Sequence, residues 1–414
     1  MTAETARPSV ILVAERTGHS GGGEAIKAQQ YADHLRAQGV ELRVITAAAS
    51  RISQGLDVPG DMLWMVEDSR LQQLLWAVPP LRPFLGVYFQ LKARALIRAE
   101  TRPGPKPVVH YISPVSPVAP RFPLKGYRNI LGPVTGNIYY PPGFRARMPW
   151  GARAREALHG LAQVLFGRLL GDKRRFATVL VSGYERTRAS LRVAGVPEAR
   201  MVDVVDAGVS DRLAARPRIA HAGANGAFMC SGRLVDHKGI DLAIRAVAGA
   251  GAGVTLDIYG DGPERPRLER LVAALDLRER VTFHGWLADH DALIAEFARY
   301  RGYILPSLAE ANGIVMQEAM MAGLPVVALR WGGPAMLADD ASALYVVPES
   351  DAQVVRDMAA AMDLLAGDGA LAERISQAAR ARAEAHFTWE AVAASWQAAS
   401  GGAEARRDAE RLAG

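Results

Sequence analysis

Short apolar runs alternate with helical patterns along almost the whole chain. The apolar runs are continuous and rich in Val, Ile and Leu, which is typical of parallel strands buried on both faces of a sheet. The alternation therefore predicts βα units. The expected strands span residues 9–15, 40–46, 107–112, 127–131, 177–182 and 201–206 in the first half, and 227–231, 254–259, 281–285, 303–307, 325–329 and 343–347 in the second.

Helical segments lie between several of these strands. The first, residues 24–38, is ended by Gly39. Because two βα series follow one another, we expect an α/β fold with two Rossmann-like, doubly wound domains that face a cleft. The other expected helices include residues 240–249, 263–275, 291–298, 314–322 and 352–365.

The length of 414 residues suits two domains. Residues 206–226 mix Gly, Pro, Ala and Arg without a clear period, so the junction is expected there. The predicted domains are residues 1–206 and 207–388, and a helix in 389–414 is expected to return to the first domain. Ligands of open α/β sheets bind at the carboxyl ends of the strands, so the loops that follow strands are expected to carry the chemistry.

Charge is distributed unevenly between the two halves. The whole chain has a net charge of +6, but residues 1–200 carry +14 and residues 201–414 carry −8. This asymmetry indicates different partners for the halves, attraction between them, or a basic surface kept for solubility. A basic half raises the question of nucleic acid. The arginines are not interleaved with an RNA-binding aromatic motif and no zinc-finger spacing occurs, so no nucleic-acid partner is expected.

Cysteine and histidine usage narrows the classes further. A single cysteine, Cys230, excludes an internal disulfide framework and fits a reducing compartment. The histidines are scattered without an H-E-x-x-H pattern, so no metal site is expected. We find neither a secretory signal nor a transmembrane run, and we expect a cytoplasmic location.

The first glycine-rich loop, residues 18–24, follows the first strand and opens a helix. Gly22 and Gly23 would let backbone N–H groups approach a phosphate at the helix N-terminus. The loop does not read G-x-G-x-x-G, and the second strand lacks the acidic residue that holds a dinucleotide ribose, which weakens a dehydrogenase interpretation. The alternative is a glycine-rich turn needed only for geometry.

A second group, residues 231–239, also lies between a strand and a helix. After Gly232 it places two cations, Arg233 and Lys238, at the carboxyl end of a strand. A guanidinium fork and an ammonium group suit the neutralisation of a departing diphosphate. The alternative is a pair of solvated cations that cap a loop.

The third group, residues 305–320, is the most specific. Glu310 lies in the loop before a helix, and Glu318 lies on the second turn of that helix. A carboxylate offers two oxygens to the vicinal hydroxyls of a ribose, a role that suits Glu318, whereas Glu310 could reach sugar hydroxyls. The alternative is two surface glutamates near a positive helix end. Free N–H groups at the start of this helix would point at an anion, and they belong to Asn312, Gly313 and Ile314.

Together these motifs resemble the retaining glycosyltransferases of family 4 over nearly the whole chain. The resemblance implies a GT-B fold, an acceptor-binding first domain and a second domain that holds a nucleotide sugar, with UDP as the expected nucleotide and no metal or other cofactor. By position, it assigns Arg233 and Lys238 to the diphosphate, Glu318 to the ribose, Glu310 to the donor sugar and the backbone at His284 to the nucleobase. The segments that carry it are GGGE, SGRLVDHKG, IYGDGPE, VTFHGWL, PSLAEANGIVMQEAM and HFTWE.

Two departures from the family bear on the site. The family often reads E-G-F-G where this chain has Glu310-Ala311-Asn312-Gly313, so contacts to the transferred sugar are expected to differ. The loop at 132–137 resembles that of a subgroup with G-P-V-G-G-G. His110 resembles that subgroup's histidine and is a candidate catalytic imidazole, with a hydrogen-bonded histidine at a strand end as the alternative.

Residues 143–175 form a basic segment with interleaved apolar residues. They contain eight Lys and Arg against two acidic residues. Such a segment can lie on an anionic bilayer with its apolar face down. Residues 71–97 are similar, and the alternative for both is ordinary helices packed on a sheet. A peripheral position on the cytoplasmic membrane is therefore one expectation.

The expected function is transfer of a sugar from a nucleotide-diphosphate sugar to a glycan or lipid-linked acceptor, in cell-envelope or exopolysaccharide synthesis. Glu310, His110, Lys238 and Arg233 form the expected catalytic set. A nucleotide-sugar epimerase, a sugar phosphorylase and a catalytically silent nucleotide-binding scaffold are the alternatives.

Overall fold

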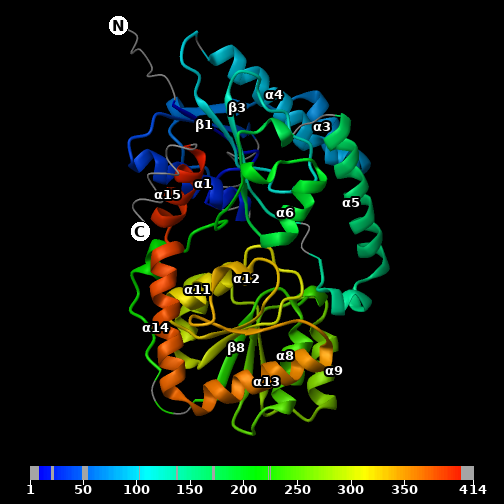
Figure 1. The fold of residues 1–414 in the computed structure, drawn as a ribbon, viewed down its shortest axis with the longest axis vertical. Helices are drawn as coiled ribbons and strands as arrows, with labels where there is room; N and C mark the ends of the chain where they lie inside the picture. Colours follow the sequence, from blue (N-terminus) through cyan, green and yellow to red (C-terminus); the bar gives the residue numbers. More distant parts are fainter. Residues whose placement is uncertain are drawn as a thin grey trace. The chain divides into compact units, whose positions relative to one another are not determined.

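By its packing, the chain divides into two compact units (Figure 1). Unit 1 comprises Met1–Asn137, Arg155–Asp206 and Val392–Gly414, and unit 2 comprises Ile138–Ala154 and Ala207–Ala391. The computed structural model describes residues 9–19, 23–48, 55–101, 103–136, 139–169, 173–221, 223 and 225–401.

The described part of unit 1 is built on a seven-stranded parallel sheet with the strand order β3-β2-β1-β4-β5-β6-β7. The order reverses between β1 and β4, the point where doubly wound sheets open a crevice. The strands are β1 (Val10–Val13), β2 (Leu42–Ala47), β3 (Leu63–Val66), β4 (Val108–Tyr111), β5 (Arg128–Val134), β6 (Thr178–Val181) and β7 (Met201–Asp203). The main helices are α1 (Gly23–Ala37), α3 (Arg70–Ala77), α4 (Leu85–Glu100) and α6 (Tyr184–Val193), together with most of α5 (Trp150–Leu169) and α15 (Trp389–Ser400), whose first residues belong to unit 2.

The described part of unit 2 has a six-stranded parallel sheet, β10-β9-β8-β11-β12-β13, whose order reverses between β8 and β11. Its strands are β8 (Ala227–Ser231), β9 (Thr255–Tyr259), β10 (Val281–Gly285), β11 (Gly302–Leu305), β12 (Val326–Leu329) and β13 (Leu344–Val346). Its helices are α7 (Asp211–Ala214), α8 (Ile240–Gly249), α9 (Arg265–Ala274), α10 (His290–Glu296), α11 (Ile314–Ala322), α12 (Pro334–Leu337), α13 (Asp351–Gly367) and α14 (Gly369–His386).

Continuous apolar runs make the central strands because both faces of each sheet are covered. In β11 and β12, for example, all residues are buried. The strand β3 was not predicted: it is a short edge strand in which Val66 alone is buried, so its pattern carries a weak signal.

Residues 138–154 correct the expected first domain of 1–206. They belong to unit 2, because Tyr140, Phe144 and Met148 are buried in its hydrophobic core. Arg147 forms ion pairs with Asp241 and Asp351 of the same unit.

The last described helix, α15, leaves unit 2 at Ala391 and packs in unit 1 from Val392 onward. Its Trp396 is fully buried, and the indole N–H donates to the carbonyl of Val205 at 2.9 Å. The indole also packs against Tyr31, with ring centroids 4.8 Å apart. No helix among the described residues has both the length and the apolar composition needed to cross a bilayer.

Candidate active site

The loops after β8 and β11 meet at the point where the strand order of unit 2 reverses. Gly239 has a left-handed φ of 63°, and a Cβ atom there would lie 2.3 Å from the carbonyl oxygen of Pro306. Only glycine allows the two loops to approach so closely. A backbone hydrogen bond of 2.8 Å from Leu308 N–H to the carbonyl of His237 joins them directly.

An ion pair crosses between these two loops. Lys238 Nζ lies 2.5 Å from Glu310 Oε2, with 24% and 15% of the two side chains exposed. The backbone carbonyl of Glu310 accepts from Gly333 N–H at 2.9 Å, which fixes the acidic loop. The structure therefore brings together two groups that the sequence placed in separate motifs. Arg233, by contrast, is exposed, and its side chain has no ion pair or hydrogen bond to another described residue.

The start of α11 differs in one detail from the expected anion cradle. Gly313 caps the helix in a left-handed conformation, with φ of 70°. Its N–H already donates to Glu310 Oε1 at 3.4 Å. The N–H groups of Asn312 and Ile314 donate to no other described residue, and the Asn312 side chain accepts from Gln317 Nε2 at 3.2 Å. Two of the three predicted N–H groups therefore remain open.

Glu318 has a partner that the sequence did not predict. The glutamate is 8% exposed, and its Oε1 lies 2.8 Å from His290 Nε2. The hydrogen bond with Glu318 raises the pKa of His290, and the charges of Asp291 and Asp289 act in the same direction. His290 begins α10, which is remote in sequence from Glu318. The one sequence feature that could have indicated this contact is the position of His290 after β10, because that loop lies at the same edge of the sheet.

His284, at the end of β10, is held by its side chain. The imidazole stacks on Tyr259 with centroids 4.5 Å apart and 9° between the planes. Its Nε2 lies 3.1 Å from Asp257 Oδ2, which also accepts from the hydroxyl of Tyr300. The side chain thus fixes the position of the backbone that was predicted to meet a nucleobase.

In unit 1, the glycine loop after β1 is described only in part. Gly22 lies outside the described residues. Gly23 is the first residue of α1, and a Cβ atom placed on it would have no heavy atom within 4 Å. The helix start is therefore open.

His110 is buried in unit 1, with 2% of its surface exposed. Its Nε2 hydrogen-bonds the carbonyl of Gly132 at 2.7 Å, and its ring packs edge-on to Tyr31 at 5.5 Å. Burial lowers its pKa to about 4. This geometry matches the alternative, a hydrogen-bonded histidine at a strand end, and the catalytic role of His110 stays a prediction.

A cavity of about 390 Å³ lies at the corresponding edge of unit 1. Glu15, after β1, and Pro114, after β4, line it, and a hydrogen bond of 2.8 Å from Glu15 N–H to Ser113 Oγ joins these two loops. Burial raises the pKa of Glu15. The other lining residues come from three segments, and the sequence did not predict that these segments lie together. They are Arg16, Trp76, Arg82, Leu85, Gly86, Val87, Gln90, Ala119 and Pro120.

Part of unit 2 is similar in sequence to a known family. Residues 211–382 match the model of "Glycosyl transferases group 1". The matched segment, the group 1 domain, lies within unit 2 and covers less than half of the chain. This group 1 domain contains Arg233, Lys238, His284, Glu310 and Glu318, whereas His110 and the glycine loop lie outside it.

Relatives of the group 1 domain bear glycosyltransferase names. The chain is 35% identical to alpha-D-kanosaminyltransferase of Streptomyces kanamyceticus over 35% of this chain and 38% of the relative. It is 32% identical to the lipopolysaccharide core biosynthesis glycosyltransferase LpsE of Rhizobium meliloti over 40% of this chain and 46% of the relative. The similarity thus spans less than half of either relative.

The fold as a whole is similar to that of solved GT-B enzymes. The crystal structure of Anabaena Alr3699/HepE in complex with UDP has a TM-score of 0.57 and 16% identity, and the match covers 98% of this chain and 99% of that one. The predicted fold class, two Rossmann-like α/β domains of the GT-B type, is confirmed.

Proposed function

We propose that this chain is a retaining hexosyltransferase that moves a sugar from a nucleotide-diphosphate sugar to a glycan or lipid-linked acceptor in cell-envelope or exopolysaccharide synthesis. The observation that carries the proposal is the ion pair of Lys238 and Glu310, which are 72 residues apart in sequence. It lies at the carboxyl edge of the group 1 domain, in the loop that leads into the helix of Glu318. The names of the relatives and the UDP complex of the structural neighbour support this class.

In this proposal, Lys238 and Arg233 bind the diphosphate of the donor. Arg233 is exposed and Lys238 is tied to one carboxylate, so a multiply charged diphosphate would compete with Glu310 for the ammonium group. Glu310 would then be released toward the hydroxyls of the sugar. Glu318 would bind the ribose with the carboxylate oxygen that His290 does not occupy. The open N–H groups of Asn312 and Ile314 would face the phosphates.

Retention follows from attack on the same face that the diphosphate leaves. The bond between the anomeric carbon and the phosphate oxygen breaks, and the acceptor oxygen bonds to that carbon. The acceptor's proton passes to the departing phosphate oxygen, so no strong protein base is needed. The main task of the protein is then to stabilise the charge that develops on the diphosphate, for which we assign Lys238 and Arg233 in place of a metal ion.

Acceptor-dependent release of nucleoside diphosphate tests this function. The purified chain is incubated with UDP-sugars and a panel of glycan and lipid-linked acceptors, with and without EDTA. We expect release only when both substrates are present, unaffected by EDTA, and a product with the donor's anomeric configuration. Donor binding without turnover on any acceptor would favour a silent scaffold. Turnover of the donor without an acceptor, or phosphate as the required second substrate, would favour an epimerase or a phosphorylase.

The acceptor is assigned to the cavity of unit 1. A half-buried carboxyl (Glu15), an exposed indole (Trp76) and a guanidinium (Arg82) line one concave surface, which combines hydrogen-bonding groups with an apolar face. Arg82 stands over the Trp76 ring at 5.2 Å. We expect Trp76→Ala to raise the acceptor KM with little change in the donor KM. An unchanged acceptor KM would remove the cavity from the proposal.

A peripheral position on the inner face of the cytoplasmic membrane is a second part of the proposal. Leucines on α5 remain exposed although the helix packs through the buried Gln163: Leu158 (63%), Leu161 (66%), Leu165 (50%) and Leu169 (72%). Their spacing places them along one side of the helix. Flotation with anionic vesicles tests the idea. The double variant Leu161→Gln/Leu165→Gln should lose binding, and Leu364→Gln, an exposed leucine of unit 2, should keep it. Equal binding of the two would contradict it.

A further inference from the structure

A second cavity of unit 1 lies at the amino ends of its strands, opposite to the edge where ligands of doubly wound sheets bind. It has a volume of about 570 Å³. Its lining comes from residues 123–129 around the start of β5, Arg174 and Arg175 before β6, and Arg200 directly before β7. These three strands are neighbours in the sheet, so three successive loops enclose one space.

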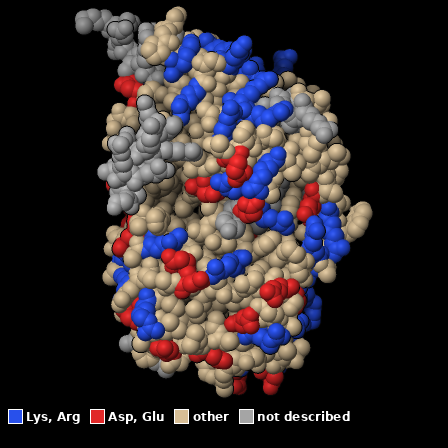
Figure 2. All heavy atoms as spheres, in the orientation of Figure 1, with Lys and Arg blue, Asp and Glu red and all other residues tan. Residues whose placement is uncertain are grey.

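Four cationic side chains line this basic cavity, namely Lys125, Arg174, Arg175 and Arg200, and no carboxylate is among its described lining residues. A fifth cation, Lys106, stands 5.3 Å from the centre of the ring of the lining Tyr127. Lys125 and Arg175 have no ion pair or hydrogen bond with another described residue. Figure 2 shows the same imbalance on a larger scale, with Lys and Arg gathered over the upper part of unit 1 and few acidic side chains among them.

The loops that carry these cations are braced. Asn129 is 3% exposed, and its side chain accepts from Leu124 N–H at 3.1 Å and donates to the carbonyls of Leu124 at 2.8 Å and Tyr127 at 2.9 Å. These bonds fix the turn that presents Lys125. Arg200 donates to the carbonyls of Arg174 and Phe176, which fixes the segment that presents Arg175. The backbone segments that present Lys125 and Arg175 are therefore held in place before any ligand arrives, which lowers part of the entropy that binding costs.

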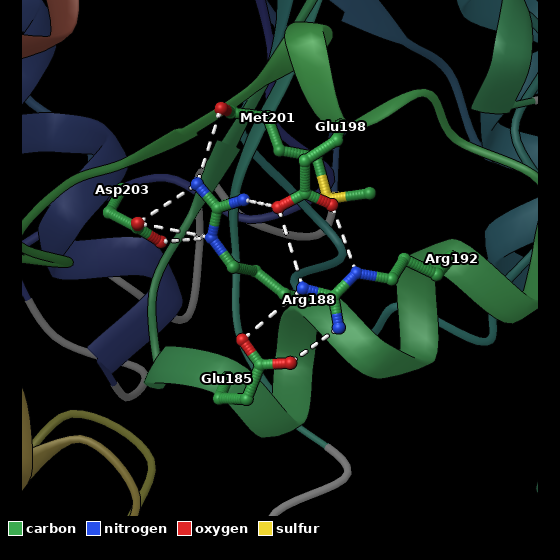
Figure 3. Close-up of polar contacts among 6 residues, drawn as sticks. All are labelled: Glu185, Arg188, Arg192, Glu198, Met201 and Asp203. Atoms are coloured by element: carbon green, nitrogen blue, oxygen red, sulfur yellow. Dashed lines mark hydrogen bonds and ion pairs between the residues drawn. The ribbon is translucent and has the colours of Figure 1, made fainter.

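In another arginine cluster of unit 1, each guanidinium group is paired with carboxylates (Figure 3). Arg188 of α6 pairs with Glu198 and Asp203, and Arg192 pairs with Glu185 and Glu198. Three carboxylates thus neutralise two guanidinium groups. Lys125 and Arg175 of the basic cavity have no such partner among the described residues, and like charges gathered without a counter-ion destabilise the folded state. This contrast indicates that the counter-ion is a ligand.

We propose that the basic cavity binds a phosphate group at a site separate from the donor site of unit 2. Guanidinium forks and an ammonium group are the side chains that best match a phosphate with two negative charges. The volume leaves room for a group attached to the phosphate. A nucleobase is a poor occupant because Tyr127 is the one aromatic side chain among the described lining residues, and Lys106 already stands over one face of its ring. The phosphate can belong to a lipid headgroup or to a soluble phosphorylated compound.

Calorimetric titration with inorganic phosphate tests the site. All proteins carry Lys238→Gln, which weakens the proposed donor site. In this background, the double variant Lys125→Gln/Arg175→Gln should raise the Kd for phosphate by about tenfold or more, since each change removes a charge-assisted bond. Arg70→Gln, which removes an exposed cation of unit 1 outside the cavity, should leave the Kd unchanged. Equal Kd values for the double variant and Arg70→Gln, or no binding at millimolar phosphate, would overturn the proposal.

Vesicles distinguish the two sources of the phosphate. A lipid headgroup as the ligand predicts three results. Vesicles of phosphatidylglycerol, but not of phosphatidylcholine, bind the protein, and inorganic phosphate releases it from them. The same vesicles fail to bind Lys125→Gln/Arg175→Gln. If the double variant loses phosphate binding but not vesicle binding, the ligand is a soluble compound. Either result supports the site. In an otherwise unchanged chain, the double variant should keep its kcat with a soluble acceptor, so failure of this site and failure of the proposed function are distinguishable.

Discussion

Unit 1 and unit 2 arrange corresponding strands in the same order, yet they place charge differently. Unit 2 has charged side chains at the edge where its strand order reverses, in the pairs Lys238–Glu310 and His290–Glu318. Unit 1 buries the imidazole of His110 at a strand end. At the opposite edge of its sheet it holds Lys125 and Arg175, which have no partner among the described residues. The same backbone topology therefore supports two kinds of surface, because side chains in the loops, rather than the sheet, carry the chemistry.

The largest expected difference between the units concerns stability. Trp396→Ala should destabilise unit 1 by about 3–5 kcal/mol, because it removes a fully buried indole and its hydrogen bond to Val205. Hydrogen exchange would show faster exchange in the strands of unit 1 and unchanged protection in unit 2. Trp150→Ala is the matched control, since that indole is 83% exposed. Equal loss of protection in the two units would mean that they do not unfold separately.

The second prediction concerns the charged edge of unit 2. Lys238→Gln should lower kcat by roughly 100- to 1000-fold, the usual cost of removing one preorganised group that stabilises developing charge. The melting temperature should change little, because Lys238 is part-exposed. Steady-state release of nucleoside diphosphate provides the measurement, and Arg245→Gln, an exposed cation of the same unit, provides the control. Near-normal turnover of Lys238→Gln would remove it from the site.

The third prediction uses the buried imidazole of unit 1. The pKa of His110 is about 4 in the folded chain and about 6.5 in an unfolded one. As the pH falls from 6.5 to 4, this histidine becomes protonated in the unfolded state but stays neutral in the folded state. The free energy of unfolding should therefore fall by roughly 3 kcal/mol. His110→Gln should lose this part of the pH dependence, measured by denaturant unfolding at several pH values. Burial also lowers the pKa of His221 and His237, so the difference between wild type and variant is the quantity that decides. If the free energy of unfolding changes with pH in the same way in wild type and His110→Gln, the low pKa of His110 is contradicted.

The smallest predicted effect concerns His290. His290→Ala should raise the donor KM by about tenfold and leave kcat nearly unchanged, because the histidine positions Glu318 and does not touch the reacting atoms. His290→Gln can donate the same hydrogen bond and should restore much of the affinity. A fall in kcat at an unchanged KM would show instead that the histidine takes part in the chemical step.

The sequence predicted most of the fold because buried strands of parallel sheets are continuous apolar runs. Its errors came where that signal is weak or misleading. The half-exposed β3 has one buried residue, and residues 138–154 look like part of the first domain until Phe144 and Met148 are seen in the core of unit 2. Neither local pattern nor charge shows to which core a connecting segment contributes.

For the candidate site, the spacing of residues along the chain indicated which side chains lie close together within one loop. It did not indicate which loops meet. Glu310 and Glu318 are joined by one short motif, and Lys238 was found by its own. Their meeting, and the hydrogen bond of His290 to Glu318, depends on which strands are neighbours. His110 illustrates the converse: its position at a strand end was identified, but its burial depends on Tyr31 and on Trp396, near the end of the chain.

The position of Trp396 near the end of the chain also affects how unit 1 folds during synthesis on the ribosome. The sheet of unit 1 is complete at Asp203, but the helix that covers Tyr31 and His110 is made about 190 residues later. At 5–20 residues per second, the nascent unit would wait roughly 10–40 s with this apolar face uncovered. Chaperone binding to ribosome-bound chains should therefore persist until α15 emerges, and a chain cut after residue 388 should remain a chaperone client.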